Sequence, residues 1–162
     1  MSNESLRIPK HLVEVEIKDA RGVERSASVY LASASANGGR PERLQDVLRE
    51  RRFLPLRENG SFCFISREHI DWLKMDVIAA IDEFDPEAEG NAGSVSAGVK
   101  LELEDGTLLL GGIRYLLPKP ARRVGDYLEG LERFFPLRTP DYLYLINRDR
   151  IVQVIPIDEV RR

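Results

Sequence analysis

Each half of the chain begins with a stretch in which apolar and polar residues alternate strictly. The apolar positions are Val13, Val15 and Ile17 in the first stretch and Val99, Leu101 and Leu103 in the second. Successive side chains of a strand point to opposite faces, so the alternation predicts strands with one buried face, as in an antiparallel sheet. Asp105-Gly106 is a strong hairpin signal that leads into a second strand, and "DARGVERSASVYLA" predicts a similar hairpin in the first half.

A short helix and a closing hairpin follow in both halves. Apolar residues recur at helical spacing in "RPERLQDVLRER" and "RVGDYLEGLERF". Pro55 and Pro136 come next and predict a bend, because proline has no amide hydrogen to donate to a ladder. The phrases "FISREHIDWL" and "LINRDRIVQV" then predict a hairpin with its polar tip at residues 66–69 in the first half and 147–150 in the second.

The two halves are copies of one another. At an offset of 80, the recurring residues are Arg43, Asp46 and Leu48; at an offset of 81, they are Phe53, Pro55, Leu56, Arg57, Ile65, Arg67 and Ile70. The sequence therefore predicts an α+β fold of two tandem strand-strand-helix-strand-strand repeats, residues 11–78 and 97–160. Each repeat is expected to form a small antiparallel sheet or partial barrel with one short helix. The repeats are expected to be related by pseudo-two-fold symmetry, as an intramolecular pseudo-dimer.

Residues 79–96 are interpreted as a linker that is first acidic and then rich in glycine and serine. Residues 76–98 hold six acidic and no basic side chains, while residues 11–75 and 99–162 hold 11 basic and 10 acidic side chains each. Nucleic-acid binding needs a concentrated positive face, so nearly neutral modules argue against a nucleic-acid partner. With no apolar run long enough to span a bilayer, we also expect no membrane partner and a cytoplasmic location.

The chain offers little catalytic chemistry. His11 and His69 are the two histidines and fall in different predicted elements, and the single cysteine, Cys63, sits in the apolar run "FCFI". No Cys-x-x-Cys, His-Glu-x-x-His or phosphate-cradling glycine loop occurs. We therefore expect no enzyme activity, no catalytic residues, no metal site and no cofactor.

A strand, an Asp-Gly hairpin, a second strand and a later Ile-x-x-x-x-Ile hairpin resemble the small bent barrels of the Sm-like family. The tandem arrangement is also similar to a small bacterial domain of unknown function. The resemblance implies an Sm-like or SH3-like partial barrel, but it does not carry RNA binding with it. Two features depart from it: a predicted helix replaces the RNA-contacting Asp-x-x-Met-Asn run, and Arg67 and Arg148 stand where the family has glycine.

These observations predict a non-enzymatic protein-interaction module, an adaptor or regulatory subunit of a cytoplasmic bacterial complex. An exposed sheet edge could bind a protein partner by strand addition, and a homo-oligomer is left open. The alternative function is that of an Sm-like RNA-binding protein. The candidate interaction residues are the duplicated arginines and an apolar stripe at helical spacing where the first repeat passes into the linker: Arg67, Arg148, Arg57, Arg138, Ile78, Ile81 and Phe84.

Overall fold

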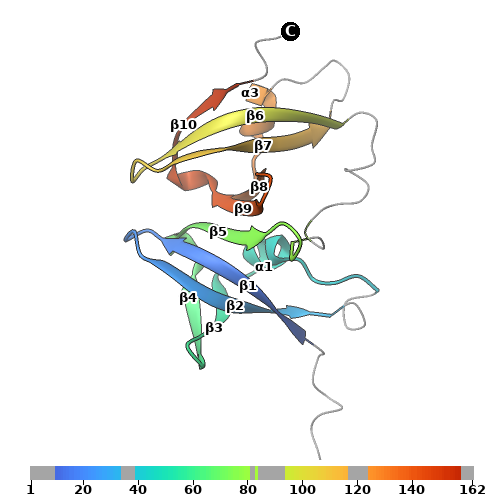
Figure 1. Ribbon diagram of the computed structural model, residues 1–162, viewed down its shortest axis with the longest axis vertical. Helices are drawn as coiled ribbons and strands as arrows, with labels where there is room; N and C mark the ends of the chain where they lie inside the picture. The colour runs from blue at the N-terminus through green and yellow to red at the C-terminus, as the bar shows by residue number, and fades with distance from the viewer. Residues whose placement is uncertain (1–9, 34–38, 81–82, 84–93, 117–123, 158–162) are drawn as a thin grey trace, which may run out of the picture.

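The computed structural model describes residues 10–33, 39–80, 83, 94–116 and 124–157 (Figure 1). The first half contains β1 (Lys10–Asp19), β2 (Glu24–Ala32), α1 (Leu44–Glu50), β3 (Phe53–Glu58), β4 (Ser61–Ser66), the 3₁₀ turn η2 (Arg67–His69) and β5 (Ile70–Asp76). The second half contains β6 (Ser94–Leu103), β7 (Leu108–Leu116), α3 (Val124–Glu129), β8 (Phe134–Arg138), β9 (Tyr142–Asn147), the 3₁₀ turn η4 (Arg148–Arg150) and β10 (Ile151–Pro156).

All these strands lie in one antiparallel sheet with the order β10-β6-β7-β8-β9-β5-β1-β2-β3-β4. The prediction of an α+β fold built from strand-strand-helix-strand-strand repeats or small barrels is therefore wrong: the protein is mainly β, and its sheet is open. The helical patterns are real but too short to form a layer, since α1 has seven residues and α3 has six. Within the described residues, no helix is long and apolar enough to cross a membrane.

The predicted closing hairpin is also wrong, because the chain makes its tight turn earlier. Pro55 does not end the strand but lies inside β3, opposite Phe64 of β4. Asn59 and Gly60 form the two-residue turn between these strands, with φ angles of 50° and 79°. The left-handed backbone of such a turn is the reason why Asn-Gly favours a hairpin. After β4, the turn η2 carries the chain away, so β5 pairs with β1 and β9 instead of β4.

The two halves are not related by the predicted pseudo-two-fold axis. The interface between the two halves is here called the joint. If a two-fold axis related the halves, the joint would pair a strand with its own counterpart in the other half. Here, β9 of the second half pairs with β5 of the first, and these strands hold different places in the repeat. The halves are therefore joined head-to-tail, and Figure 1 shows β5 and β9 where they meet, with β4 and β10 at opposite ends.

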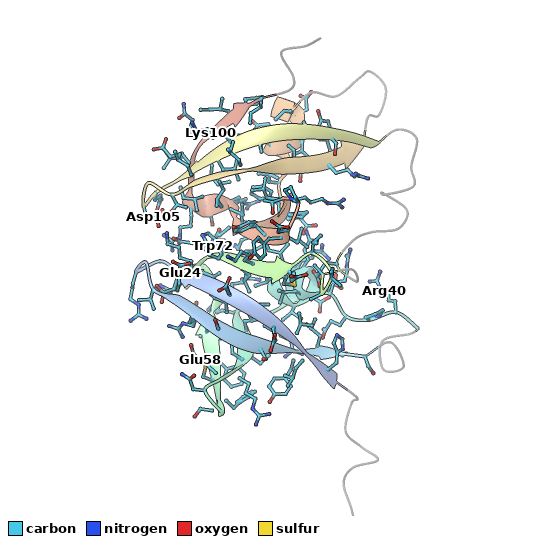
Figure 2. All side chains as sticks on the ribbon, in the orientation of Figure 1. Glu24, Arg40, Glu58, Trp72, Lys100 and Asp105 are labelled. Atoms are coloured by element: carbon cyan, nitrogen blue, oxygen red, sulfur yellow. The ribbon has the colours of Figure 1, made fainter. Side chains whose placement is uncertain are left out.

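Each half has an apolar core, and the cores exchange side chains across the joint. The first core contains inward side chains of β1, β2, β3, β5 and α1, together with Phe134, Leu143 and Leu145 of the second half. The second core contains side chains of β6 to β9 and α3, together with Trp72 of the first half. Figure 2 shows Trp72 at the level where the halves meet. The two sequence repeats therefore share one another's interiors.

Polar contacts also hold the joint. The buried side-chain amide of Asn147 donates a hydrogen bond to the Ile70 carbonyl oxygen at 2.9 Å. At the surface, Arg49 of α1 forms an ion pair with Glu132 at 2.9 Å. Lys18 of β1 pairs with Asp105 in the turn between β6 and β7. A buried amide without its acceptor costs about 1–3 kcal/mol, so the Asn147 contact fixes the joint more strongly than an exposed ion pair.

A buried carboxylate supports the start of α1. Glu83 accepts hydrogen bonds from the backbone amides of Leu44 and Gln45, the first two residues of the helix. Asp46 adds a second contact, because its carboxylate accepts the Arg43 backbone amide at 3.0 Å. Burial raises the pKa of Glu83 to about 7, although the two backbone hydrogen bonds oppose the shift. The helix therefore depends on a group that titrates near neutral pH.

Candidate functional site

Four aromatic side chains form an exposed surface on β2, β3 and β4, here called the aromatic surface: Tyr30, Phe53, Phe62 and Phe64. The three phenylalanines are between 52% and 61% exposed. The ring centroids of Phe62 and Phe64 are 5.0 Å apart in an edge-to-face arrangement, and those of Tyr30 and Phe62 are 5.8 Å apart. Large aromatic side chains that are exposed together are typical of binding surfaces.

The sequence of β4 explains why its phenylalanines point outward. In "SFCFIS", Cys63 and Ile65 face the first core and are partly buried against it. The period of a strand is two residues, so Phe62 and Phe64 must face the opposite side. The register places Phe62 opposite Arg57 of β3, so a positive charge borders the aromatic surface. The surface thus combines apolar rings with an arginine at its rim, which is a common composition for protein interfaces.

The aromatic surface lies beside an open strand edge. Within the part of the chain that the structure describes, β4 pairs with β3 on one side and has no neighbouring strand on the other. The same holds for β10, which pairs with β6 alone. One row of backbone amides and carbonyls on each end strand therefore faces outward and can pair with another strand. The β10 end is also apolar, with exposed Val152, Ile155 and Ile157.

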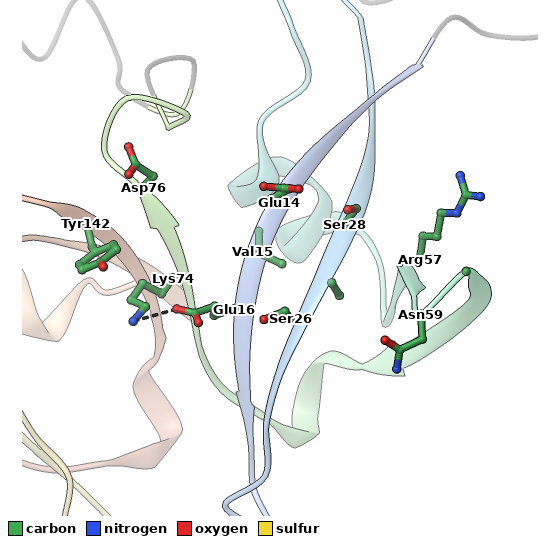
Figure 3. A pocket seen from close by; sticks show the side chains of 12 residues that line it. Glu14, Val15, Glu16, Ser26, Ser28, Arg57, Asn59, Lys74, Asp76 and Tyr142 are labelled. Carbon is green, nitrogen blue, oxygen red and sulfur yellow. Dashed lines mark ion pairs between the residues drawn. The ribbon is translucent and has the colours of Figure 1, made fainter.

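A polar groove of about 500 Å³ runs along the outer face of β1 and β2 (Figure 3). Lys74 and Glu16 form an ion pair inside it at 2.8 Å, and the Lys74 ammonium lies 4.5 Å from the ring centre of Tyr142. The hydrogen bond to Glu16 raises the pKa of Lys74, so this amine stays protonated and is a poor nucleophile. The groove offers charges for contact with a polar partner rather than a reactive amine.

Arg67 and Arg148 make equivalent contacts: each donates hydrogen bonds to backbone carbonyls at the end of the helix in its own half. Arg67 Nη1 donates to the carbonyl oxygens of Leu48 and Arg49 at 2.9 and 3.0 Å. Arg148 Nη1 donates to the carbonyl oxygen of Leu131, which follows α3. Carbonyls at a helix C-terminus lack partners within the helix, so each arginine satisfies groups that need a donor. This contact accounts for the repeated arginine, and a role in partner binding stays a prediction.

The other predicted interaction residues lie apart from one another. Arg57 lines the polar groove where the groove borders the aromatic surface. Arg138 lines a separate depression of about 300 Å³ on the second half. Ile78 is highly exposed. Ile81 and Phe84 lie outside the described residues. Of the predicted residues that the structure describes, Arg57 is therefore the one at the aromatic surface.

Sequence reasoning missed the aromatic surface itself. It treated "FCFI" as a single apolar run and did not separate its two faces. The signal that could have found the surface is Asn59-Gly60, which fixes a two-residue hairpin and hence the register of β3 with β4. With that register, Phe62 and Phe64 fall on the face opposite to Ile65.

Comparison of the chain with protein-family models, curated proteins and solved structures gives no match. Among the described residues, no group of three or more His, Cys, Asp or Glu side chains is arranged to hold a metal ion.

Proposed function

We propose that this protein is a non-enzymatic interaction module, an adaptor or regulatory subunit of a cytoplasmic bacterial complex, which binds a protein partner along β4. The observation that supports this most directly is the position of Phe62 and Phe64 on an open edge strand. Strand addition at such an edge gives backbone hydrogen bonds, and side chains on alternate positions give specificity.

The size of the apolar contribution supports the same role. Burying one exposed phenylalanine contributes about 1.5–3 kcal/mol, so burying two contributes roughly 3–6 kcal/mol. Aromatic and arginine side chains at the centre of an interface commonly carry most of the binding energy. Phe62, Phe64 and Arg57 provide both types within one hairpin.

The test uses the full chain as bait in a lysate of the source organism. The wild type is compared with Phe62→Ser/Phe64→Ser and with a control, Leu108→Ser/Leu110→Ser, which removes two exposed leucines from β7 of the second half. We expect a stoichiometric protein partner that the wild type and the control retain and the phenylalanine variant loses.

Recovery of no stoichiometric protein at any salt concentration overturns the proposal, as does a partner that all three baits bind equally. Nucleic acid that elutes with the wild type, together with a salt-sensitive mobility shift of single-stranded RNA, would instead favour the RNA-binding alternative.

A further inference from the structure

The two end strands of the sheet are the repeat counterparts of the two strands that join the halves. With the repeat offset of 81, β9 is the counterpart of β4, and β10 is the counterpart of β5. β9 and β5 pair with each other in the middle of the sheet, whereas β4 and β10 are its open ends. One molecule therefore carries the two complementary sides of a second joint, at opposite ends (Figure 1).

The exposed phenylalanines correspond to side chains that the internal joint buries. Phe53, Phe62 and Phe64 have as their counterparts Phe134, Leu143 and Leu145. These counterparts are at most 3% exposed and belong to the core of the other half. Among the described residues of the first half, no strand lies beyond β4, and the same positions are exposed. The aromatic surface is therefore one side of a joint whose other side is not found within the described part of the chain.

The receiving side is also incomplete in one molecule. At the internal joint, α1 and β5 provide fully buried apolar side chains: Leu44, Val47, Leu48, Leu73 and Met75. Their counterparts on α3 and β10 are Val124, Tyr127, Leu128, Val154 and Pro156. All of these except Val124 are only partly buried. α3 and β10 thus present apolar surface where the first half has a covered core.

Opposite charges occur at corresponding positions of the internal joint and of the second joint that β4 and β10 would form. Arg49 and Glu132 form an ion pair across the internal joint at 2.9 Å. In the other repeat, the counterpart of Arg49 is Glu129, and the counterpart of Glu132 is Arg51 or Arg52, depending on whether the offset is 81 or 80. The counterpart pair therefore has opposite charges as well, with the signs exchanged. Such complementarity favours the correct partner over a wrong one.

We propose that β4 of one chain pairs with β10 of a second copy, in the register that β9 adopts with β5. This inference rests on the proposed function of β4 as a binding edge and names its partner. The aromatic surface is then covered by α3 and β10 of the neighbour. Because the two strands differ, the contact is head-to-tail, and further copies add until a ring closes or a filament forms.

Pro156 shortens the proposed ladder by one bond. The Ile157 amide donates to the Gly98 carbonyl oxygen and so faces β6. Amides of successive strand residues point in opposite directions, so the backbone nitrogen of Pro156 faces the open edge, where it has no hydrogen to donate. The amide of Val154 also faces this edge and is available to β4 of a neighbour.

The single cysteine provides a test of the register. Lys74 is opposite Tyr144 at the internal joint, and their counterparts are Ile155 and Cys63. Opposed residues of antiparallel strands have Cα atoms about 4.5–5.5 Å apart, which suits a disulfide bond. We expect the variant Ile155→Cys, oxidised by dissolved oxygen with a copper catalyst, to form a ladder of disulfide-linked oligomers through Cys63. In the control Gln153→Cys, the new cysteine is two residues away from position 155 and should form far fewer disulfide-linked oligomers.

Peptide mapping by mass spectrometry identifies the bond. A linkage between position 63 of one chain and position 155 of another supports the proposal. Linkage between two copies of Cys63, or equal linkage by the Gln153→Cys control, overturns the proposed register.

A mixing experiment tests the head-to-tail arrangement without engineered cysteines. We expect the wild type to assemble in sedimentation velocity, and Phe62→Ser/Phe64→Ser to associate at least about a hundredfold more weakly. Val154→Pro removes an outward amide from β10 and should also prevent assembly. Mixed together, the two variants retain one intact β10 and one intact β4, so they should form a one-to-one heterodimer. Circular dichroism checks that each variant is folded.

The outcomes separate this inference from the proposed function. A wild type that stays monomeric at all concentrations overturns the inference, even if a lysate protein binds along β4 and so supports the adaptor role. Self-assembly that depends on both end strands, with no other protein captured, supports the inference and counts against the adaptor role. Assembly that the β4 variant retains, or that the mixture fails to restore, overturns the head-to-tail joint.

Discussion

The wild type should lose stability towards unfolding as the pH rises from about 4.5 through about 7, because of Glu83. Replacing Glu83 with glutamine should abolish this pH dependence. The carboxyl group ionises near 4.5 in the unfolded chain and near 7 in the folded protein, where burial raises its pKa. Between these values, the folded protein holds a proton that the unfolded chain releases. The stabilisation is therefore fully present below about pH 4.5 and is lost as the pH rises through about 7. Because one pKa unit corresponds to about 1.4 kcal/mol, the loss amounts to about 3 kcal/mol.

The assay is thermal and urea unfolding, followed by circular dichroism, at several values between roughly pH 4.5 and pH 8. For a protein of this size, the wild-type melting temperature should fall by roughly 6–12 °C over this range. Burial also raises the pKa of Asp71, so the difference between the wild type and Glu83→Gln reports on Glu83 alone. Glu50→Gln controls for the loss of one negative charge, since it changes an exposed carboxylate at the other end of α1. Parallel profiles for the wild type and Glu83→Gln would refute the reasoning.

Two further predictions concern packing and the joint, and each is read as a change in the free energy of unfolding. Gly111→Ala should destabilise the protein by about 1–3 kcal/mol, because the new methyl group would lie 2.7 Å from the backbone oxygen of Arg138. In the matched variant Gly125→Ala in α3, the new methyl group meets no atom of the described residues within 4 Å, so this variant should stabilise by about 0.5–1 kcal/mol. Equal effects of the two variants would contradict this account. Asn147→Ala should cost about 1–3 kcal/mol because the buried Ile70 carbonyl loses its donor, and an unchanged urea midpoint would show that the contact does not hold the joint.

Local pattern predicted much of the secondary structure. The alternating segments form β1 and β6, and Asp105-Gly106 turns the chain into β7. These features depend on residues that are close in the sequence, so composition and spacing reveal them. The interpretation of Pro55 as a bend was wrong because a proline whose nitrogen needs no ladder hydrogen bond is tolerated within a strand.

Pairing between distant strands could not be predicted in the same way. The phrase around Ile65 and Ile70 looks like a hairpin, yet β4 and β5 separate and each takes a different neighbour. Which strands pair is decided by burial across the whole molecule, and the pairing of β5 with β9 joins residues about seventy positions apart. The aromatic surface depends on that architecture, because Phe62 is exposed by its place at the end of the sheet.

The exchange of side chains between the two cores has a consequence for synthesis on the ribosome. The first half is made before Leu143 and Leu145, so its core cannot be completed when β5 emerges. At about 5–20 residues per second, the roughly seventy residues that follow β5 take about 4–14 seconds to translate. For that time, the nascent chain presents an uncovered apolar end. A truncated protein that stops after the first half should therefore bind chaperones or aggregate, even though it contains a whole sequence repeat.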